Sequence, residues 1–394
     1  MLSSLSRPNN FSAFIIAATT IITLLFATFY LIKRWYFSNY YVTGLPPLLK
    51  INPFLLVTKL KSAEIFGEYY KQSKLLGSLF CIELPFFPSP TVICGDIGLA
   101  RIMLTGNEQY EEADKHLLFY DGVLKLCKGP NMIAMSSTYP QVHATRKGLS
   151  QSFSTISLNK NFKAYNATLN KFIHVLSDTA KTNKPVDITT LLSAFTFDFL
   201  TAGLYRQDFH ALDGDGTDGG KLLKEFLIIQ KEIFVNQMYD PLRIHYFWNN
   251  EVKRAREAHD YVLSFIKRVI TLHRSTHSVE EISNDGSILG HLLSSDAYAS
   301  DDERVRDLLA FTVAGFDTTK STLAWLFLEL TRHPEALAKI QAELDGINPD
   351  RSVPFDVSHV SQLDYTVNAI KEAMRLWPAV PGGMHAMLIY CYLC

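Results

Sequence analysis

The sequence is short of cysteine and has no excess of charge of either sign. Five cysteines in 394 residues are too few for a disulfide scaffold. The 38 basic and 39 acidic residues give a formal net charge of −1, which argues against a protein that binds the phosphate backbone of nucleic acid. Hydrophobic residues make up 47% of the chain and charged residues 20%, a composition that excludes a disordered or collagen-like protein.

One long uncharged run stands near the start of the chain. Residues 11–32 contain no charged side chain, and Lys33 and Arg34 follow directly. As a helix this run would be about 33 Å long, enough to cross the hydrocarbon core of a bilayer. We expect an uncleaved transmembrane anchor, with a cleaved signal peptide and a buried core helix as alternatives. The basic residues after the run favour a cytosolic location for the rest of the chain.

Residues 33–50 are expected to form an interfacial, proline-rich linker, and residues 51–394 the main domain. Within that domain, residues 76–94 predict a β-hairpin, which is the only persuasive strand signal. Most of the later sequence has helical spacing. The predicted helices cover residues 159–180, 188–204, 222–239, 251–273, 302–332 and 334–344. The fold class is therefore mostly α, with a small β element near the N-terminus and one N-terminal transmembrane helix.

Two segments have a weak likeness to metal sites. Residues 213–220 are rich in aspartate and glycine, but Lys224 or Phe226 stands where a calcium loop has its bidentate glutamate. Cys391 and Cys394 form a C-x-x-C pair, which is at most half of a zinc site. We expect no metal at either segment.

A sharper motif lies inside the predicted helix 302–332. Ala314 and Gly315 are followed by Asp317, Thr318 and Thr319, and glycine and threonine are poor helix formers. A small residue here would let a flat ligand approach the backbone, and the threonine hydroxyls can bond to main-chain carbonyls. An acid beside a hydroxyl can relay protons to a bound group. The alternative is a notch for helix packing.

Two further clusters have plain alternatives. Glu372 and Arg375 are three residues apart before Pro378, so they can pair on one helix face, as many surface residues do. His143, Arg146 and Lys147 form a basic cluster that could bind an acidic ligand group or could be an exposed turn.

Taken in order, these motifs resemble the microsomal cytochrome P450 monooxygenases, and the fungal ones in particular. Residues 314–319 are similar to the family's A-G-x-D-T-T helix, and residues 372–375 to its E-x-x-R helix. Residues 330–335 match the helix break between the two, and residues 143–154 resemble the fungal form of the helix that contacts the haem propionates. Val142 stands where many relatives have tryptophan.

The resemblance implies a role for each residue. Asp317 and Thr318 would be catalytic and deliver protons to oxygen at the haem iron. Ala314 and Gly315 would lie over the haem face, and Arg146 would pair with a propionate. Glu372 and Arg375 would form a structural ion pair that supports the haem-binding core.

The resemblance also implies the protein's partners. The cofactor would be haem, with electrons from NADPH through NADPH-cytochrome P450 reductase. The chain would be a single-pass protein of the endoplasmic reticulum membrane with its body in the cytosol. It would hydroxylate a lipophilic small molecule, in our interpretation a fungal secondary metabolite.

The family's iron ligand has no counterpart in this sequence. The ligand cysteine lies in a loop F-x-x-G-x-R-x-C-x-G, which this sequence does not contain, and Cys391 follows Arg375 by only 16 residues. We therefore expect residues 51–394 to be an incomplete cytochrome P450 domain, truncated before this loop, with the C-terminal part of the fold missing and no metal ligand. The alternative to an enzyme is then a truncated, non-catalytic remnant.

Overall fold

The computed structural model describes most of the chain after residue 64. The described ranges are 65–82, 91–105, 114–115, 128–133, 135–136, 139–182, 185–237, 243–349, 357–380 and 385–386, together with isolated positions between 20 and 49. The chain divides into two compact units, residues 1–112 and residues 113–394. Each unit is described by itself.

The first unit contains the hairpin that the sequence predicts. Its elements are α3 (Ile65–Leu76), β1 (Leu79–Ile82), β2 (Thr91–Cys94) and α4 (Ile97–Thr105). β1 and β2 are antiparallel, with Leu79 opposite Cys94, which confirms the predicted hairpin. Pro47 and Leu49 lie beside β1, since the Cys81 N–H donates to the carbonyl of Pro47 at 2.9 Å and the Leu49 N–H donates to the carbonyl of Cys81 at 2.8 Å.

The expected anchor, residues 11–32, lies largely outside the described residues. Within it only six positions are described, and all six are helical: Thr20, Ile21, Leu24, Ala27, Thr28 and Leu31. In the part of the chain that the structure describes, no helix has both the length and the apolar character needed to cross a membrane. Most of the expected linker 33–50 and the C-x-x-C pair of Cys391 and Cys394 also lie outside the described residues.

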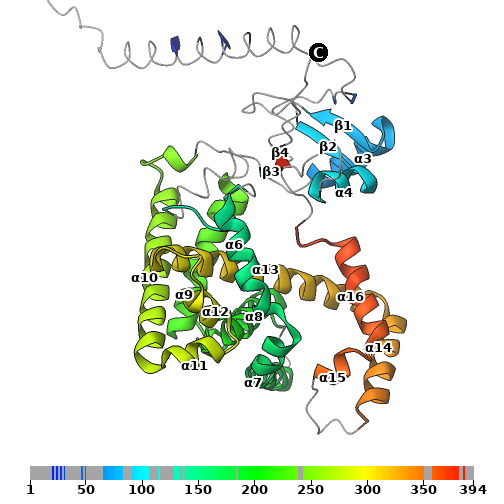
Figure 1. Cartoon of the computed structure of the whole chain (residues 1–394). Helices are drawn as coiled ribbons and strands as arrows, with labels where there is room; N and C mark the ends of the chain where they lie inside the picture. The colour runs from blue at the N-terminus through cyan, green and yellow to red at the C-terminus, as the bar shows by residue number, and fades with distance from the viewer. Residues whose placement is uncertain are drawn as a thin grey trace, which may run out of the picture. The chain divides into compact units, whose positions relative to one another are not determined.

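The second unit is mostly helical (Figure 1). Its helices and turns before residue 250 are α6 (Pro140–Leu149), η1 (Ser150–Phe153), α7 (Thr155–Lys181), α8 (Ile188–Leu204), η2 (Ala211–Asp213), α9 (Asp218–Gln230), η3 (Lys231–Gln237) and η4 (Arg243–His245). Those after residue 249 are α10 (Asn250–Thr276), α11 (Val279–Asn284), α12 (Ile288–Ser294), α13 (Asp301–Arg332), α14 (Pro334–Ile347), α15 (Val357–Val360) and α16 (Asp364–Leu376). A two-residue antiparallel pair, β3 (Asp114–Lys115) with β4 (His385–Ala386), was not predicted.

Each predicted helix is present, and local sequence sets its ends. α8 has the predicted bounds and begins where the Asp187 carboxylate accepts from the N–H groups of Thr189 and Thr190. α13 begins after Ser300, whose hydroxyl caps it, and has three acidic residues in its first turn. The predicted helix 222–239 is α9 followed by one stretch of π-helix, η3.

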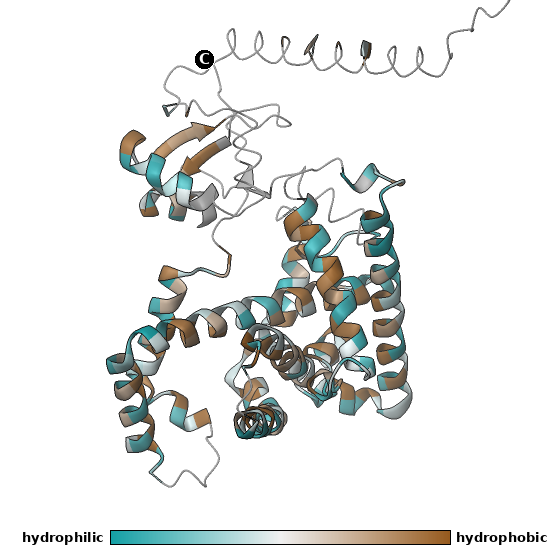
Figure 2. Ribbon diagram, turned by 180° about the vertical axis from the view of Figure 1, so that it is seen from behind, coloured by the Kyte–Doolittle hydropathy of each residue, from teal (hydrophilic) through white to brown (hydrophobic). Residues whose placement is uncertain are grey.

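The core of this unit lies where α8, α9 and α10 meet the first half of α13. Phe316 of α13 is fully buried, and its ring centroid lies 5.7 Å from that of Phe197 on α8 and 6.4 Å from that of Phe226 on α9. The buried residues of α10 recur every three or four positions, which is the pattern of a helix with one apolar face. Hydrophobic and hydrophilic residues alternate along these helices in Figure 2.

The aspartate- and glycine-rich segment 213–220 is a turn that starts α9. The Thr217 hydroxyl caps the helix by accepting from the Gly220 N–H at 2.9 Å. A Cβ at Gly219 would lie 1.8 Å from the carbonyl oxygen of Phe209, so only glycine fits there. Among the described residues no group of histidine, cysteine, aspartate or glutamate side chains could hold a metal ion. The composition of this segment therefore reflects close backbone packing.

Candidate active site

One stripe of α13 organises the candidate site. Asp307, Phe311, Ala314 and Thr318 are spaced by four, three and four residues, so they lie on the same helix face. Seven residues after Thr318, the same face continues with Trp325. The stripe is occupied by neighbouring segments at both ends and is open in the middle.

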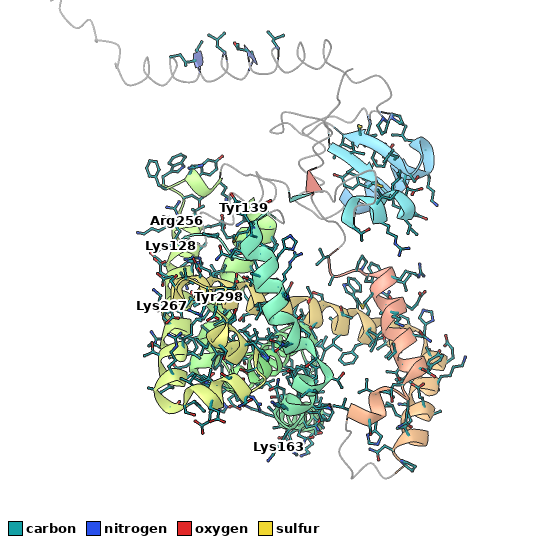
Figure 3. All side chains as sticks on the ribbon, in the orientation of Figure 1. Lys128, Tyr139, Lys163, Arg256, Lys267 and Tyr298 are labelled. Atoms are coloured by element: carbon teal, nitrogen blue, oxygen red, sulfur yellow. The ribbon has the colours of Figure 1, made fainter. Side chains whose placement is uncertain are left out.

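At its N-terminal end, a buried carboxylate joins the stripe to two other segments. Asp307 accepts a hydrogen bond from the Met132 N–H at 2.7 Å and one from the Tyr298 hydroxyl at 2.7 Å. Burial raises the pKa of Asp307. Tyr298, labelled in Figure 3, lines the same small cavity as Thr145 of α6, and the Gln141 side chain of α6 donates to Oε2 of Glu303 on α13 at 3.3 Å. This network therefore fixes α6 and the chain near Met132 against α13.

α6 and η1 carry two exposed side chains, one of which contacts the stripe. Arg146 follows the buried Thr145, is exposed, and has no ion pair with any described residue. Phe153 at the end of η1 is 58% exposed, and its ring centroid lies 6.4 Å from that of Phe311. The aromatic contact marks the boundary between the occupied end of the stripe and its open middle.

The open middle contains the motif residues. Ala314 is exposed and Thr318 is half-buried. The Thr318 hydroxyl donates to the Ala314 carbonyl at 2.9 Å, and the Thr319 hydroxyl donates to the Gly315 carbonyl at 2.8 Å. Hydroxyls that bond back to the helix in this way loosen it slightly. Asp317 is half-buried beside the stripe and forms an ion pair with Lys320.

Gly315 faces a different direction from Ala314. A Cβ at Gly315 would lie 2.8 Å from Cδ1 of Leu200 on α8. The absence of a side chain at Gly315 therefore lets α8 and α13 approach closely. This placement matches the packing notch that the sequence left open as an alternative, and it separates Gly315 from the open face.

At the C-terminal end, tryptophans hold α16 against α13. The rings of Trp325 and Trp377 are stacked, with centroids 4.1 Å apart and planes 6° from parallel. The Trp377 Nε1–H donates to Oε1 of Glu329 at 3.0 Å. Glu343 of α14 fixes the start of α16, because its carboxylate accepts from the N–H of Thr366 at 2.8 Å.

The acidic and basic residues that the sequence singled out on α16 form an ion pair with each other. Arg375 donates from Nε and Nη2 to the two carboxylate oxygens of Glu372, at 2.7 and 2.5 Å. This pairing lowers the pKa of Glu372. Both side chains are more than half exposed, so the pair lies in solvent at the surface of the described part of the chain.

The structure brings some predicted residues together and leaves others apart. Ala314, Asp317 and Thr318 share one turn of α13, and Arg146 lies on the helix that is fixed to the same stripe. Sequence reasoning missed Asp307, Tyr298, Phe311 and Trp325. The three- and four-residue spacing back from Ala314 would have placed Asp307 and Phe311 on its face.

Two cavities of the described part of the chain are not lined by residues 314–319. One of about 470 Å³ is lined by residues of α10 and of the segments after α8 and α11. A much smaller one, about 10 Å³, adjoins Asp307 and Met132. Ala314 is exposed at the middle of the stripe, so a flat group could cover the helix there.

Comparison with known proteins identifies the family. The sequence profile of the family "Cytochrome P450" matches residues 45–390. Cytochrome P450 CYP94D108 of Paris polyphylla is 28% identical over 228 residues, covering 55% of this chain and 44% of the relative. Cytochrome P450 monooxygenase pvhE of Talaromyces variabilis is 28% identical over 208 residues, covering 52% of this chain and 37% of the relative. The chain thus spans about half the length of the curated relatives it matches.

Solved structures share the fold. The retinoic acid-bound cyanobacterial CYP120A1 superposes with a TM-score of 0.66 at 18% sequence identity, covering 86% of this chain and 71% of the other. The cytochrome P450 CYP102L1 gives a TM-score of 0.68 at 17% identity, covering 85% and 72%. With the family profile matched over most of its length, the chain belongs to the cytochrome P450 family, whose members are oxidoreductases of the monooxygenase type.

Proposed function

We propose that this protein is a membrane-anchored haem monooxygenase that hydroxylates a lipophilic small molecule. The observation that carries the proposal is the open stretch of α13, where exposed Ala314 and the Thr318 hydroxyl lie between two occupied ends of one helix face. A small side chain at Ala314 leaves room for a flat group against the helix. Family membership implies that this group is haem.

The described residues fit one face of a haem. Ala314 presents only a methyl group, and Arg146 presents a guanidinium without an ion pair in the described part of the chain, which suits a propionate. The described cysteines are Cys81 and Cys94, both in the first unit, so the described residues of the second unit offer no thiolate. Haem would supply an iron that activates O2, and a thiolate ligand to that iron would donate the electron density that favours O–O bond cleavage.

Two side chains of α13 could handle protons beside that face. The Thr318 hydroxyl already donates to the Ala314 carbonyl, so its oxygen lone pairs are free to accept a proton or a hydrogen bond. Asp317, paired with Lys320, is one residue away and half-buried, so it can exchange protons with solvent. We assign Gly315 a packing role against Leu200 and not a contact with the cofactor.

The substrate and the cellular location of the protein can be proposed more narrowly. We propose a fungal secondary metabolite as substrate, and the similarity to a monooxygenase of Talaromyces variabilis supports this. A lipophilic substrate is supported by the fold shared with a structure that is bound to retinoic acid. NADPH-cytochrome P450 reductase would supply electrons, and residues 11–32 would anchor the protein in the endoplasmic reticulum membrane.

The test compares two neighbouring threonines in the haem-loaded protein, assayed in membranes with NADPH and a reductase. Thr318→Val removes a hydroxyl from the open stretch, and we expect the product formed per NADPH consumed to fall at least about tenfold. Thr319→Val is the matched control. The Thr319 hydroxyl also donates to a main-chain carbonyl, that of Gly315, but Thr319 faces about 100° away from Thr318 around the helix. It should leave the ratio unchanged.

Two results would contradict the proposal. Equal effects of the two valine substitutions would remove Thr318 from the proton path. If the reduced protein gives no thiolate-type spectrum with carbon monoxide, the alternative of a non-catalytic remnant is favoured instead.

A further inference from the structure

One cavity lies outside the stripe of α13. It has a volume of about 470 Å³ and lies between the end of α8, the last turns of α10 and the segment after α11. Its apolar wall consists of the Tyr205 ring, Val269 and Leu272, and Leu272 is 55% exposed. Cavities of this size accommodate small organic molecules.

The opposite wall is rich in hydrogen-bond donors. Arg206 has a φ of 56°, in the left-handed region, and its guanidinium donates to the carbonyl oxygens of Lys160 and Asp285. These two bonds use two of the five N–H groups of the guanidinium, so three remain for another acceptor. Gln207 is exposed beside it and lines the same cavity.

Two histidines complete the cavity. The rings of His273 and His277 are stacked with centroids 4.4 Å apart. His273 is only 9% exposed, and its Nε2 has no hydrogen-bond partner among the described residues, although Oδ2 of Asp285 lies 3.3 Å away. A ligand atom in line with this nitrogen could make the well-directed hydrogen bond that Asp285 does not make.

The charges of the wall decide the class of ligand. Asp285 is the acidic residue that lines the cavity, and its two carboxylate oxygens already accept from the N–H and the hydroxyl of Ser287, at 2.5 and 2.8 Å. A cation would lie beside the Arg206 guanidinium, whose positive charge would repel it. No described cluster of metal-binding side chains includes these histidines. An oxyanion, in contrast, would be bound by charge-assisted hydrogen bonds.

We propose that this cavity binds a small aromatic carboxylate. The carboxylate lies between Arg206 and His273, and the aromatic body lies on Tyr205, Val269 and Leu272. This inference does not depend on haem or on the proposed monooxygenase reaction. It has a structural link to α13, because the Tyr205 hydroxyl and the Thr312 hydroxyl are hydrogen-bonded at 2.9 Å.

The test titrates the full chain with benzoate and follows the ring-proton NMR signals of the histidines. We expect saturable shifts of the His273 and His277 signals with a Kd below about 1 mM, a reasonable limit for a ligand of so few atoms. Benzamide has the same body without the charge, and it should bind at least about tenfold more weakly.

One substitution tests the role of the guanidinium. Arg206→Gly removes it at a position whose left-handed backbone favours glycine, so the fold should be retained. We expect at least about tenfold weaker benzoate binding. Arg268→Gln on α10, outside the cavity, makes the same change in charge and should bind as the unaltered chain does.

The proposal is wrong if benzoate gives no saturable shift at about 10 mM, well above the expected Kd, or shifts the signals no more than benzamide does. It is also wrong if the Arg206→Gly protein, shown to be folded by its circular dichroism, binds benzoate as tightly as the unaltered chain.

Discussion

The two halves of α13 differ in how they are held. From Val305 to Phe316 the helix has six buried hydrophobic residues and packs into the core formed with α8 and α10. From Asp317 to Arg332 only Leu326 is buried, and the helix is held to α16 by stacked tryptophans and a hydrogen bond. One continuous helix therefore passes from the interior of the fold to a surface that neighbouring groups cover only in part.

We infer that the packed half of α13 mainly stabilises the fold, while the open half provides the candidate site. Burial of apolar surface is the main stabilising term in folding, so the first half should carry most of the free energy of unfolding that α13 contributes. The motif residues Ala314 and Thr318 lie at the transition between the halves, where the helix is fixed but one face is open. Rigid support beside an open face is what a binding site requires.

The largest expected effect comes from truncating one phenylalanine in each half. Phe316→Ala removes a fully buried ring that contacts Phe197 and Phe226, and it should lower the free energy of unfolding by about 3–5 kcal/mol. Phe327→Ala, the matched control, removes a ring that is 38% exposed and should cost about 1 kcal/mol or less. Urea unfolding of both variants measures the difference. Equal losses would show that the two halves are equally packed.

A smaller effect should come from a polar group inside the packed region. His259 of α10 is fully buried, and neither ring nitrogen has a hydrogen-bond partner among the described residues. Burial lowers its pKa from 6.5 to about 4, and the nearby Asp260 offsets this only in part. Between these two pH values the unfolded chain binds a proton at His259 that the folded chain does not.

Stability should therefore fall as the pH falls through this range. Because the pKa of His259 is lower in the folded state, the free energy of unfolding should fall by on the order of 2 kcal/mol between about pH 7.5 and about pH 5. His259→Leu should remove that part of the pH dependence, as urea midpoints at the two pH values would show. If the variant loses as much stability on acidification as the unaltered chain, His259 is not the group responsible.

The sequence predicts the packed half better than the open half. Periodicity of apolar residues indicated the helices with bounds close to those observed, because packing against a core requires that spacing. The hairpin was predicted from its own run of β-prone residues on either side of a proline-bearing turn. In contrast, β3 and β4 consist of two residues each and lie 270 positions apart in the chain, so no local pattern could have indicated that they pair.

The motif residues show the limit of local sequence information. The glycine and threonines of residues 314–319 identified the correct turn of α13, but sequence alone could not say that Gly315 faces Leu200 while Ala314 faces outward. Nor could it show that Asp307 binds the Met132 N–H, since 175 residues separate the two. Such contacts depend on tertiary packing, and only their spacing along a helix face is visible beforehand.

At the far end of α13, a single tryptophan can be tested for its part in holding α16. Trp377→Phe removes the hydrogen bond to Glu329 and part of the stack on Trp325, so it should destabilise the attachment of α16 by about 1 kcal/mol. Hydrogen exchange should then quicken in α16 but not in the core helices. Glu372→Gln, in α16 just before Trp377, is the control, because its partner Arg375 lies in solvent, where an ion pair contributes little. If this control loosens α16 as much as Trp377→Phe does, the tryptophan stack is not the main attachment of α16. Electrostatics would then contribute as much as ring stacking at the open half of α13, whereas the packed half depends on burial.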